Sequence, residues 1–214
     1  MTKSLYFIDF FLFLDKIKII MIDASLLKQL REETKVSLEK CQKALEDAQG
    51  DLEKAKEILK KEGIKTAEKK KERQTKAGII ESYVHTNKKI GVLVKLAAET
   101  DFVVKNQLFS ELAHNIAMQI AAMNPTYISP EDIPEEVLKE MKEIYLKELE
   151  DLKKPKEILE KVIEGKMKKR FEEICLLEQP YIKDPEMKIS DLIKTYISKL
   201  GENITVLEFA RLEI

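Results

Sequence analysis

The chain has 214 residues and carries 38 Lys and Arg against 39 Asp and Glu, which leaves a formal net charge of −1. This length allows one sizeable core with a small satellite domain, and the balanced charge excludes a global field that would attract nucleic acid or an anionic membrane. Neither Cys41 nor Cys175 belongs to a CxxC pair, so we expect buried thiols in a reducing compartment and no structural zinc site.

Residues 1–20 contain the most apolar stretch of the chain, LYFIDFFLFL at 5–14. The stretch is too short to span a bilayer, which needs about 20 apolar residues. A signal peptide would need an uninterrupted apolar region, and Asp9 interrupts this stretch. Because an N-cap pattern begins soon after Met21, we interpret 1–20 as an upstream extension from a misassigned start, with a membrane-associating segment as the alternative.

Residues 22–63 are predicted to form three short amphipathic helices. Ser37 is placed to cap the second helix and Asp51 the third, while Gly50 and Gly63 are expected to end the helices that precede them. A bundle of about forty residues has a small core and little room for a concave site. We therefore expect this segment to be a docking module.

The segment 64–76 is strongly charged and is predicted to be a helical or flexible linker. A basic run of this kind can touch RNA phosphates, but no aromatic residues interleave with it for base stacking. We therefore favour a solvated linker and expect no nucleic-acid partner.

The remaining chain, 77–214, begins with two stretches of strand character, IIESYVH at 79–85 and IGVLVKLA at 90–97. Together they predict a β-hairpin. The consecutive apolar residues of the second stretch favour a strand in mid-sheet or one covered on both sides. The alternating pattern at 204–214 predicts a third strand that joins the hairpin.

Helical patterns occupy most of the chain between the second and third strands. Asn106 is expected to cap a long helix that continues through Met123. Two patterns rich in Glu and Lys, 135–152 and 155–175, predict an exposed helical hairpin with a break at Gly165. An extended turn at 179–185 and an amphipathic helix at 189–200 are expected to follow, with Gly201 as the helix stop. The predicted fold class is α+β, with a small antiparallel sheet and packed helices.

The sequence contains no GxSxG, HExxH, P-loop or GxGxxG motif, so we expect no enzymatic activity, no cofactor and no metal site. His85 and His114 are the histidines available as a general base, but nothing near either one supplies a nucleophile or an orienting group. An α+β enzyme that uses Asp101 with one of these histidines is the alternative.

The segment Thr100-Asp101-Phe102-Val103 follows a predicted strand and precedes a predicted helix, which places an acid and a large aromatic ring side by side at a loop. Local sequence leaves two interpretations open. In one, Asp101 caps a turn and Phe102 fills the core; in the other, the two side chains form a functional surface.

Four stretches, in this order, resemble the elongation factor Ts family: TKVSLEKCQKAL at 34–45 with GDLEKA at 50–55, ETDFVVKN at 99–106, CLLEQPYIKD at 175–184 and LGENITV at 200–206. The resemblance covers essentially residues 22–214. It implies a UBA-like module at 22–63 that docks on GDP-bound elongation factor Tu, and a core that promotes GDP release as a cytoplasmic guanine nucleotide exchange factor. An adaptor that uses the helical module alone is the alternative.

Carried over by position, Thr100, Asp101, Phe102 and Val103 match the segment with which the family dislodges Mg²⁺ from elongation factor Tu. The resemblance implies that Phe102 is an apolar wedge and that Asp101 competes for local polar contacts. Loss of Mg²⁺ coordination leaves the phosphate charge of GDP undercompensated and weakens nucleotide binding. The core at 77–214 is shorter than that of the long family members, which implies a short form that pairs two copies into a homodimer.

Overall fold

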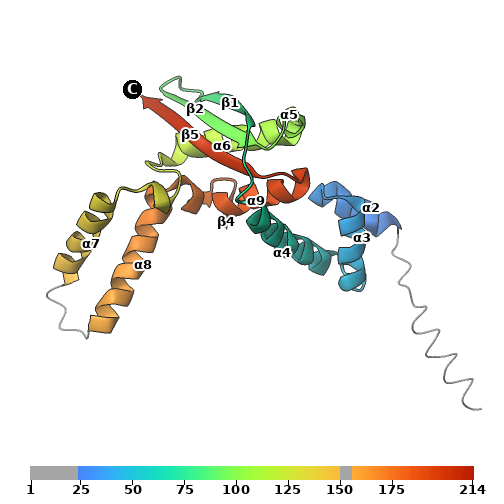
Figure 1. Cartoon of the computed structure of the whole chain (residues 1–214), viewed down its shortest axis with the longest axis horizontal. Helices are drawn as coiled ribbons and strands as arrows, with labels where there is room; N and C mark the ends of the chain where they lie inside the picture. The colour runs from blue at the N-terminus through green and yellow to red at the C-terminus, as the bar shows by residue number, and fades with distance from the viewer. Residues whose placement is uncertain (1–23, 150–155) are drawn as a thin grey trace, which may run out of the picture. The chain divides into compact units, whose positions relative to one another are not determined.

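The computed structural model describes residues 24–149 and 156–214, and the chain divides after Glu68 into two compact units (Figure 1). The predicted extension at 1–20 lies outside the described residues. Within the described ranges, no helix is long and apolar enough to cross a membrane.

The first unit contains α2 (Ala24–Thr34), α3 (Leu38–Asp47) and the beginning of α4 (Leu52–Lys70). Its core is formed by buried apolar side chains from all three helices: Leu30, Cys41, Ala44, Leu45, Ala55 and Leu59. The predicted cap at Asp51 is confirmed, because one of its carboxylate oxygens accepts hydrogen bonds from the backbone N–H groups of Glu53 and Lys54, both at 3.1 Å. Ser37 lies at the N-cap position of α3, but its side chain makes no cap hydrogen bond there.

The predicted end of the third helix at Gly63 is wrong, because α4 continues to Lys70. A glycine inside a helix is unfavourable by about 1 kcal/mol relative to alanine. Good helix formers on both sides outweigh this, and both Gly63 and Ala67 are buried on one face of the helix. The first part of the predicted linker is therefore helical.

The second unit is built around a three-stranded antiparallel sheet with the order β1-β2-β5 (Figure 1). The strands are β1 (Ala77–Val84), β2 (Ile90–Ala98) and β5 (Ile204–Glu213). Both the predicted hairpin and the third strand are confirmed, and β2 lies in mid-sheet as its apolar sequence indicated. The register of β2 against β5 shifts between Lys95 and Leu96, where β5 carries an extra residue.

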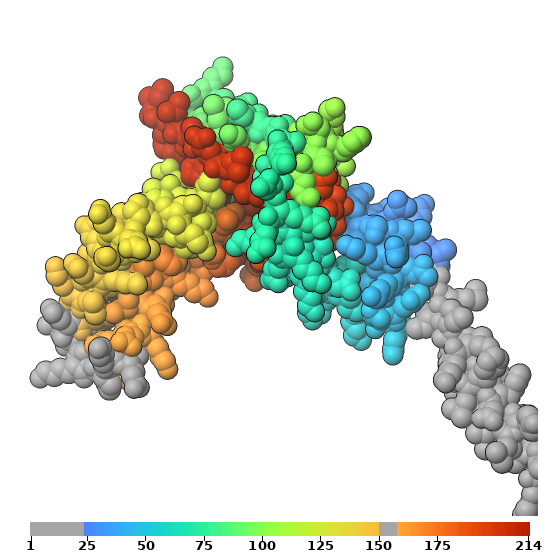
Figure 2. Space-filling view, viewed as in Figure 1, coloured from blue at the N-terminus to red at the C-terminus, as the bar shows by residue number. Residues whose placement is uncertain are grey.

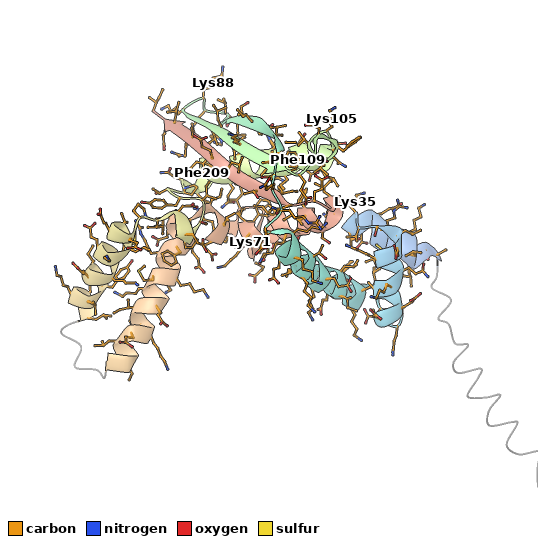
Figure 3. The ribbon with its side chains drawn as sticks, viewed as in Figure 1. Lys35, Lys71, Lys88, Lys105, Phe109 and Phe209 are labelled. Atoms are coloured by element: carbon orange, nitrogen blue, oxygen red, sulfur yellow. The ribbon has the colours of Figure 1, made fainter. Side chains whose placement is uncertain are left out.

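One face of this sheet is covered by α6 (Gln107–Met123), which contacts β1 and β2, and by α9 (Ile189–Leu200), which contacts β5 and α6. The face of α6 is fully buried at its large apolar positions, which are Phe109, Leu112, Ile116 and Ile120. Asn106 caps α6 as predicted by accepting a hydrogen bond from the backbone N–H of Leu108 at 2.9 Å. Figure 3 labels the buried Phe109 of α6 and the half-buried Phe209 of β5.

The predicted helical hairpin is formed by α7 (Glu135–Leu149) and α8 (Lys156–Ile174), which lie side by side (Figure 1). The predicted break at Gly165 is wrong, because α8 passes through this exposed glycine without interruption. Two short 3-10 turns, Pro130–Asp132 and Leu176–Glu178, flank the hairpin. The predicted extended turn at 179–185 is part of a small β-hairpin formed by β3 (Pro180–Tyr181) and β4 (Asp184–Lys188).

Candidate partner-binding site

The segment that carries the predicted site residues is a one-turn helix, α5 (Asp101–Val104), between the end of β2 and the start of α6. Thr100 is its N-cap residue, with extended backbone angles. Asp101 places a carboxylate in the first turn, where negative charge is favourable for the helix dipole. In the space-filling view this segment projects, in yellow-green, from the surface of the second unit (Figure 2).

The four side chains point in different directions. Val103 is buried at 8% exposure, and α5 contacts both β1 and β2. Phe102 is 90% exposed, and Asp101 is also exposed. The interpretation in which Phe102 fills the core is therefore wrong, and Val103 is the apolar anchor of this turn.

Thr100 is held by a residue far away in the sequence. Its backbone N–H donates to one carboxylate oxygen of Glu202 at 2.9 Å, and its hydroxyl donates to the other at 2.6 Å. The neighbouring Glu99 accepts a hydrogen bond from the backbone N–H of Asn203 at 2.7 Å and pairs with Arg73 at 3.5 Å. Two consecutive carboxylate contacts thus connect the start of α5 to the turn between α9 and β5.

Glu202 was not among the predicted site residues, although its carboxylate holds Thr100. The available signal was the stretch 200–206, in which Gly201 was identified only as a helix stop. Gly201 does end α9, with a φ of +79°, and the two polar residues that follow it reach back to the start of α5.

The two histidines are brought together around Tyr83. The hydroxyl of Tyr83 lies 3.0 Å from Nδ1 of His85, and its ring meets the ring of His114 edge to face at 5.7 Å. Nδ1 of His114 also lies 3.1 Å from a carboxylate oxygen of Glu81. Among the described residues, the partners of the histidine nitrogens are Tyr83 and Glu81, and Asp101 is not a hydrogen-bond or ion-pair partner of either histidine.

The face of the sheet opposite α6 is apolar and exposed. Four large apolar side chains on the three strands are between 51% and 78% exposed, namely Ile80, Val84, Leu93 and Leu212. A shallow hollow on the same face is lined by Gly78, Ile80, Lys95 and Leu207, among others. Exposed apolar groups of this kind are typical of surfaces that bind another protein.

No group of His, Cys, Asp and Glu in the described ranges could hold a metal ion. Both cysteines are free and buried, as predicted, and burial raises the pKa of the Cys175 thiol to about 11. Among the described residues, the chemistry of the site is therefore that of exposed apolar and carboxylate side chains on a rigid support.

The described residues thus form a small helical unit with its own core and an α+β unit that displays an aromatic ring on a one-turn helix. A family model described as Elongation factor TS matches residues 10–214. The chain belongs to the elongation factor Ts family and is a translation elongation factor.

Similar proteins named Elongation factor Ts occur in several bacteria. The protein of Thermosipho melanesiensis is 52% identical over 194 residues, which is 91% of this chain and 99% of the relative. The protein of Thermodesulfovibrio yellowstonii is 51% identical over 193 residues, 90% of this chain and 96% of the relative. The protein of Thermotoga maritima is 53% identical with the same coverage.

Proposed function

We propose that this chain is a cytoplasmic guanine nucleotide exchange factor that binds GDP-bound elongation factor Tu and accelerates GDP release without making or breaking a covalent bond. The observation that carries this proposal is the display of Phe102, 90% exposed, beside the exposed carboxylate of Asp101 on α5. A large apolar ring held in water contributes little to folding, and its burial against a partner would contribute about 1.5–3 kcal/mol.

The mechanism follows from the charge of the nucleotide. Mg²⁺ in the partner neutralises the phosphate oxygens of GDP, so a displaced ion leaves that negative charge undercompensated. Phe102 acts as the wedge that displaces partner backbone near the ion. Asp101 brings a carboxylate that competes for contacts with the ion and its ligands. By linkage, the factor weakens GDP binding by the same ratio by which GDP weakens binding of the factor.

The first unit supplies affinity rather than exchange. It is a UBA-like bundle whose buried side chains form a separate core, and Leu38, at the start of α3, is 47% exposed. An exposed leucine beside a helix N-terminus provides an apolar contact for the nucleotide-binding domain of the partner. This contact keeps the second unit tethered to the same partner.

We also propose that the outer face of the sheet pairs two copies of the chain into a homodimer. Ile80, Val84, Leu93 and Leu212 form an apolar surface across all three strands, and two such faces can pack against each other as in a β-sandwich. Leu93→Lys should produce a monomer in sedimentation equilibrium, whereas Ser110→Lys, at an exposed position on α6, should leave the mass unchanged. A monomeric wild-type chain at micromolar concentration would overturn this part.

The test of exchange is the release of a fluorescent GDP analogue from purified elongation factor Tu, measured with and without the full chain over a range of Mg²⁺ concentrations. Phe102→Ala should reduce the acceleration about 10- to 100-fold, since the lost burial of about 1.5–3 kcal/mol corresponds to one or two factors of ten. Leu146→Ala, at an apolar position of α7 that is 50% exposed, is the matched control and should keep full activity.

Binding of the wild-type chain to elongation factor Tu with an unchanged GDP off-rate would contradict the exchange proposal and favour the adaptor alternative. Full acceleration by Phe102→Ala would show that another side chain is the wedge.

A further inference from the structure

The direction of Phe102 cannot come from α5 alone. The turn has four residues and is closed by only a few backbone hydrogen bonds, including those from the N–H of Lys105 to the carbonyl of Asp101 at 3.1 Å and from Asn106 to Val103 at 3.0 Å. A single helical turn is unstable in isolation, because nucleation fixes several residues for very few hydrogen bonds. Its orientation must therefore be set by contacts with the rest of the unit.

Two residues of the segment 100–104 hold α5 in the second unit, in addition to the preceding Glu99, which accepts a hydrogen bond from the backbone N–H of Asn203 at 2.7 Å. Val103 is buried against the sheet, which fixes one point of the turn. Thr100 is the second point, and its hydroxyl makes no cap hydrogen bond within α5. Instead, its hydroxyl and backbone N–H both donate to Glu202, 102 residues away. Val103 and Thr100 thus hold α5 at two separate points, and the contact with Glu202 is the one that fixes its N-terminal end.

Glu202 is itself held in place by its neighbours. It follows Gly201, which has a φ of +79°, and it precedes Asn203, which is only 4% exposed. The side-chain amide of Asn203 donates to the carbonyls of Lys71 at 3.3 Å and Arg73 at 2.8 Å. This turn therefore holds the backbone on both sides of Glu202, whose carboxylate accepts the two hydrogen bonds from Thr100. Hydrogen bonds to a charged acceptor are stronger than neutral ones.

We propose that Glu202 is a positioning residue for nucleotide exchange, which grips Thr100 and so fixes the direction in which Asp101 and Phe102 leave the surface. This inference rests on the exchange function proposed above. It divides the segment 100–103 into two side chains that face the partner, Asp101 and Phe102, and two that hold the turn, Thr100 and Val103.

Loss of this grip should affect the rate of release more than the affinity for the partner. Glu202 does not provide the apolar docking contacts, so the complex should still form. The wedge would then occupy its productive direction in only a fraction of the complexes, and the maximal rate would fall to that fraction of the wild-type value. General destabilisation of the fold would lower the amount of active protein and raise the half-saturating concentration. A fall in the maximal rate at a nearly constant half-saturating concentration is therefore specific to a positioning role.

The first experiment measures the release of the fluorescent GDP analogue at increasing concentrations of the full chain. Glu202→Ala should lower the maximal rate about tenfold, which corresponds to about 1.4 kcal/mol, with the half-saturating concentration within about twofold of wild type. Glu202→Gln keeps one acceptor oxygen and should restore part of the rate. Glu186→Ala removes an exposed glutamate from β4 and is the matched control, with wild-type kinetics expected. A wild-type maximal rate for Glu202→Ala would overturn the proposal.

The second experiment needs no partner. The chain contains no tryptophan, so Phe102→Trp places a single reporter on α5. Adding Glu202→Ala to this variant should lower the fluorescence anisotropy of Trp at position 102, whereas adding Glu186→Ala should leave it unchanged. Equal anisotropy in all three proteins would refute the positioning role even if exchange were impaired. If the wild-type chain failed to accelerate GDP release, the exchange function would fall, and the anisotropy would still decide whether Glu202 orients α5.

Discussion

Gly78→Ala should weaken the sheet at its edge strand, because no space exists for a methyl group at this position of β1. A Cβ atom added to Gly78 would lie 2.6 Å from the carbonyl oxygen of Leu96 and 3.2 Å from Cα of Ala97. Both atoms belong to the backbone of β2, which is paired on its other side with β5. Since β2 is held from both sides, β1 must move away and stretch its hydrogen bonds.

The size of this effect follows from two opposing contributions. Overpacking of this kind costs about 1–3 kcal/mol, while replacement of glycine by alanine restricts the unfolded chain and returns about 0.4–1 kcal/mol. We therefore expect Gly78→Ala to lower the free energy of unfolding by about 1–2 kcal/mol. Gly91→Ala in β2 is the matched control. Within the chain, nothing lies within 4 Å of its added Cβ, so only the stabilising contribution applies to the fold of a single copy.

Urea unfolding followed by tyrosine fluorescence measures the difference between these variants. Of the six tyrosines, only Tyr6 precedes residue 69, so the signal reports chiefly on the second unit. The urea midpoint should fall for Gly78→Ala and should rise slightly or stay constant for Gly91→Ala. Equal midpoints for the two variants would show that β1 can adjust its distance from β2 without loss, and would refute the reasoning.

Three further substitutions test other contacts of the second unit. Arg211→Met should lower the free energy of unfolding by about 1 kcal/mol in urea titrations, because the guanidinium donates to the carbonyl of Ala121 at the end of α6 at 3.4 and 3.3 Å. Gln119→Leu should lower it by about 1–3 kcal/mol, because the backbone N–H of Ile182 donates to this buried amide at 2.9 Å; unchanged hydrogen-exchange protection of that N–H would contradict the assignment. Burial raises the pKa of Cys175 from 9.0 to about 11, so its protonated form stabilises the fold fully below pH 9, and this contribution is lost as the pH rises through 11. Cys175→Ala should therefore reduce the fall in stability between pH 9 and pH 11, and an identical pH dependence would count against this origin.

Glycine was the least dependable signal in the sequence. Gly201 was predicted to end a helix and is the C-cap of α9, with a φ of +79°. Gly50 was also predicted to end a helix. It has a φ of +83° and lies in the turn after α3, which ends at Asp47 and has Ala48 as its C-cap. Gly63 and Gly165 were given the same role and lie inside continuous helices. Gly50 and Gly201 have a positive φ, whereas Gly63 and Gly165 do not. The sequence alone does not show this angle, because it depends on the packing around each glycine.

Local capping chemistry was predictable for a physical reason. Asp51 and Asn106 each accept a hydrogen bond from a backbone N–H two residues further along the chain. The information needed to predict such a cap therefore lies within a few residues. The same applies to the three strands, whose alternation and apolar runs are local properties.

Gln119 shows where that local information ends. It lies on the packing face of α6 and is fully buried. Its role, however, is to hold the β3–β4 hairpin, through hydrogen bonds to Gln179 at 3.2 Å, the carbonyl of Pro180 at 3.1 Å and the backbone N–H of Ile182. These partners lie about sixty residues further along, and no periodic pattern indicates them.

The candidate site combines features that local sequence predicts with contacts between distant parts of the chain. The position of α5 follows from local sequence, because β2 ends before it and Asn106 starts α6 after it. Local sequence left the exposure of Phe102 open, because it does not show which side chain of the turn faces the sheet. In the structure Val103 faces the sheet, and Phe102 is exposed. The direction of the turn depends on Glu202, in a different stretch of the chain. The stretches 99–106 and 200–206, which resembled the family separately, therefore form one structural site. A chain that kept the first stretch and lost the carboxylate of the second would carry the same exposed side chains without a fixed direction.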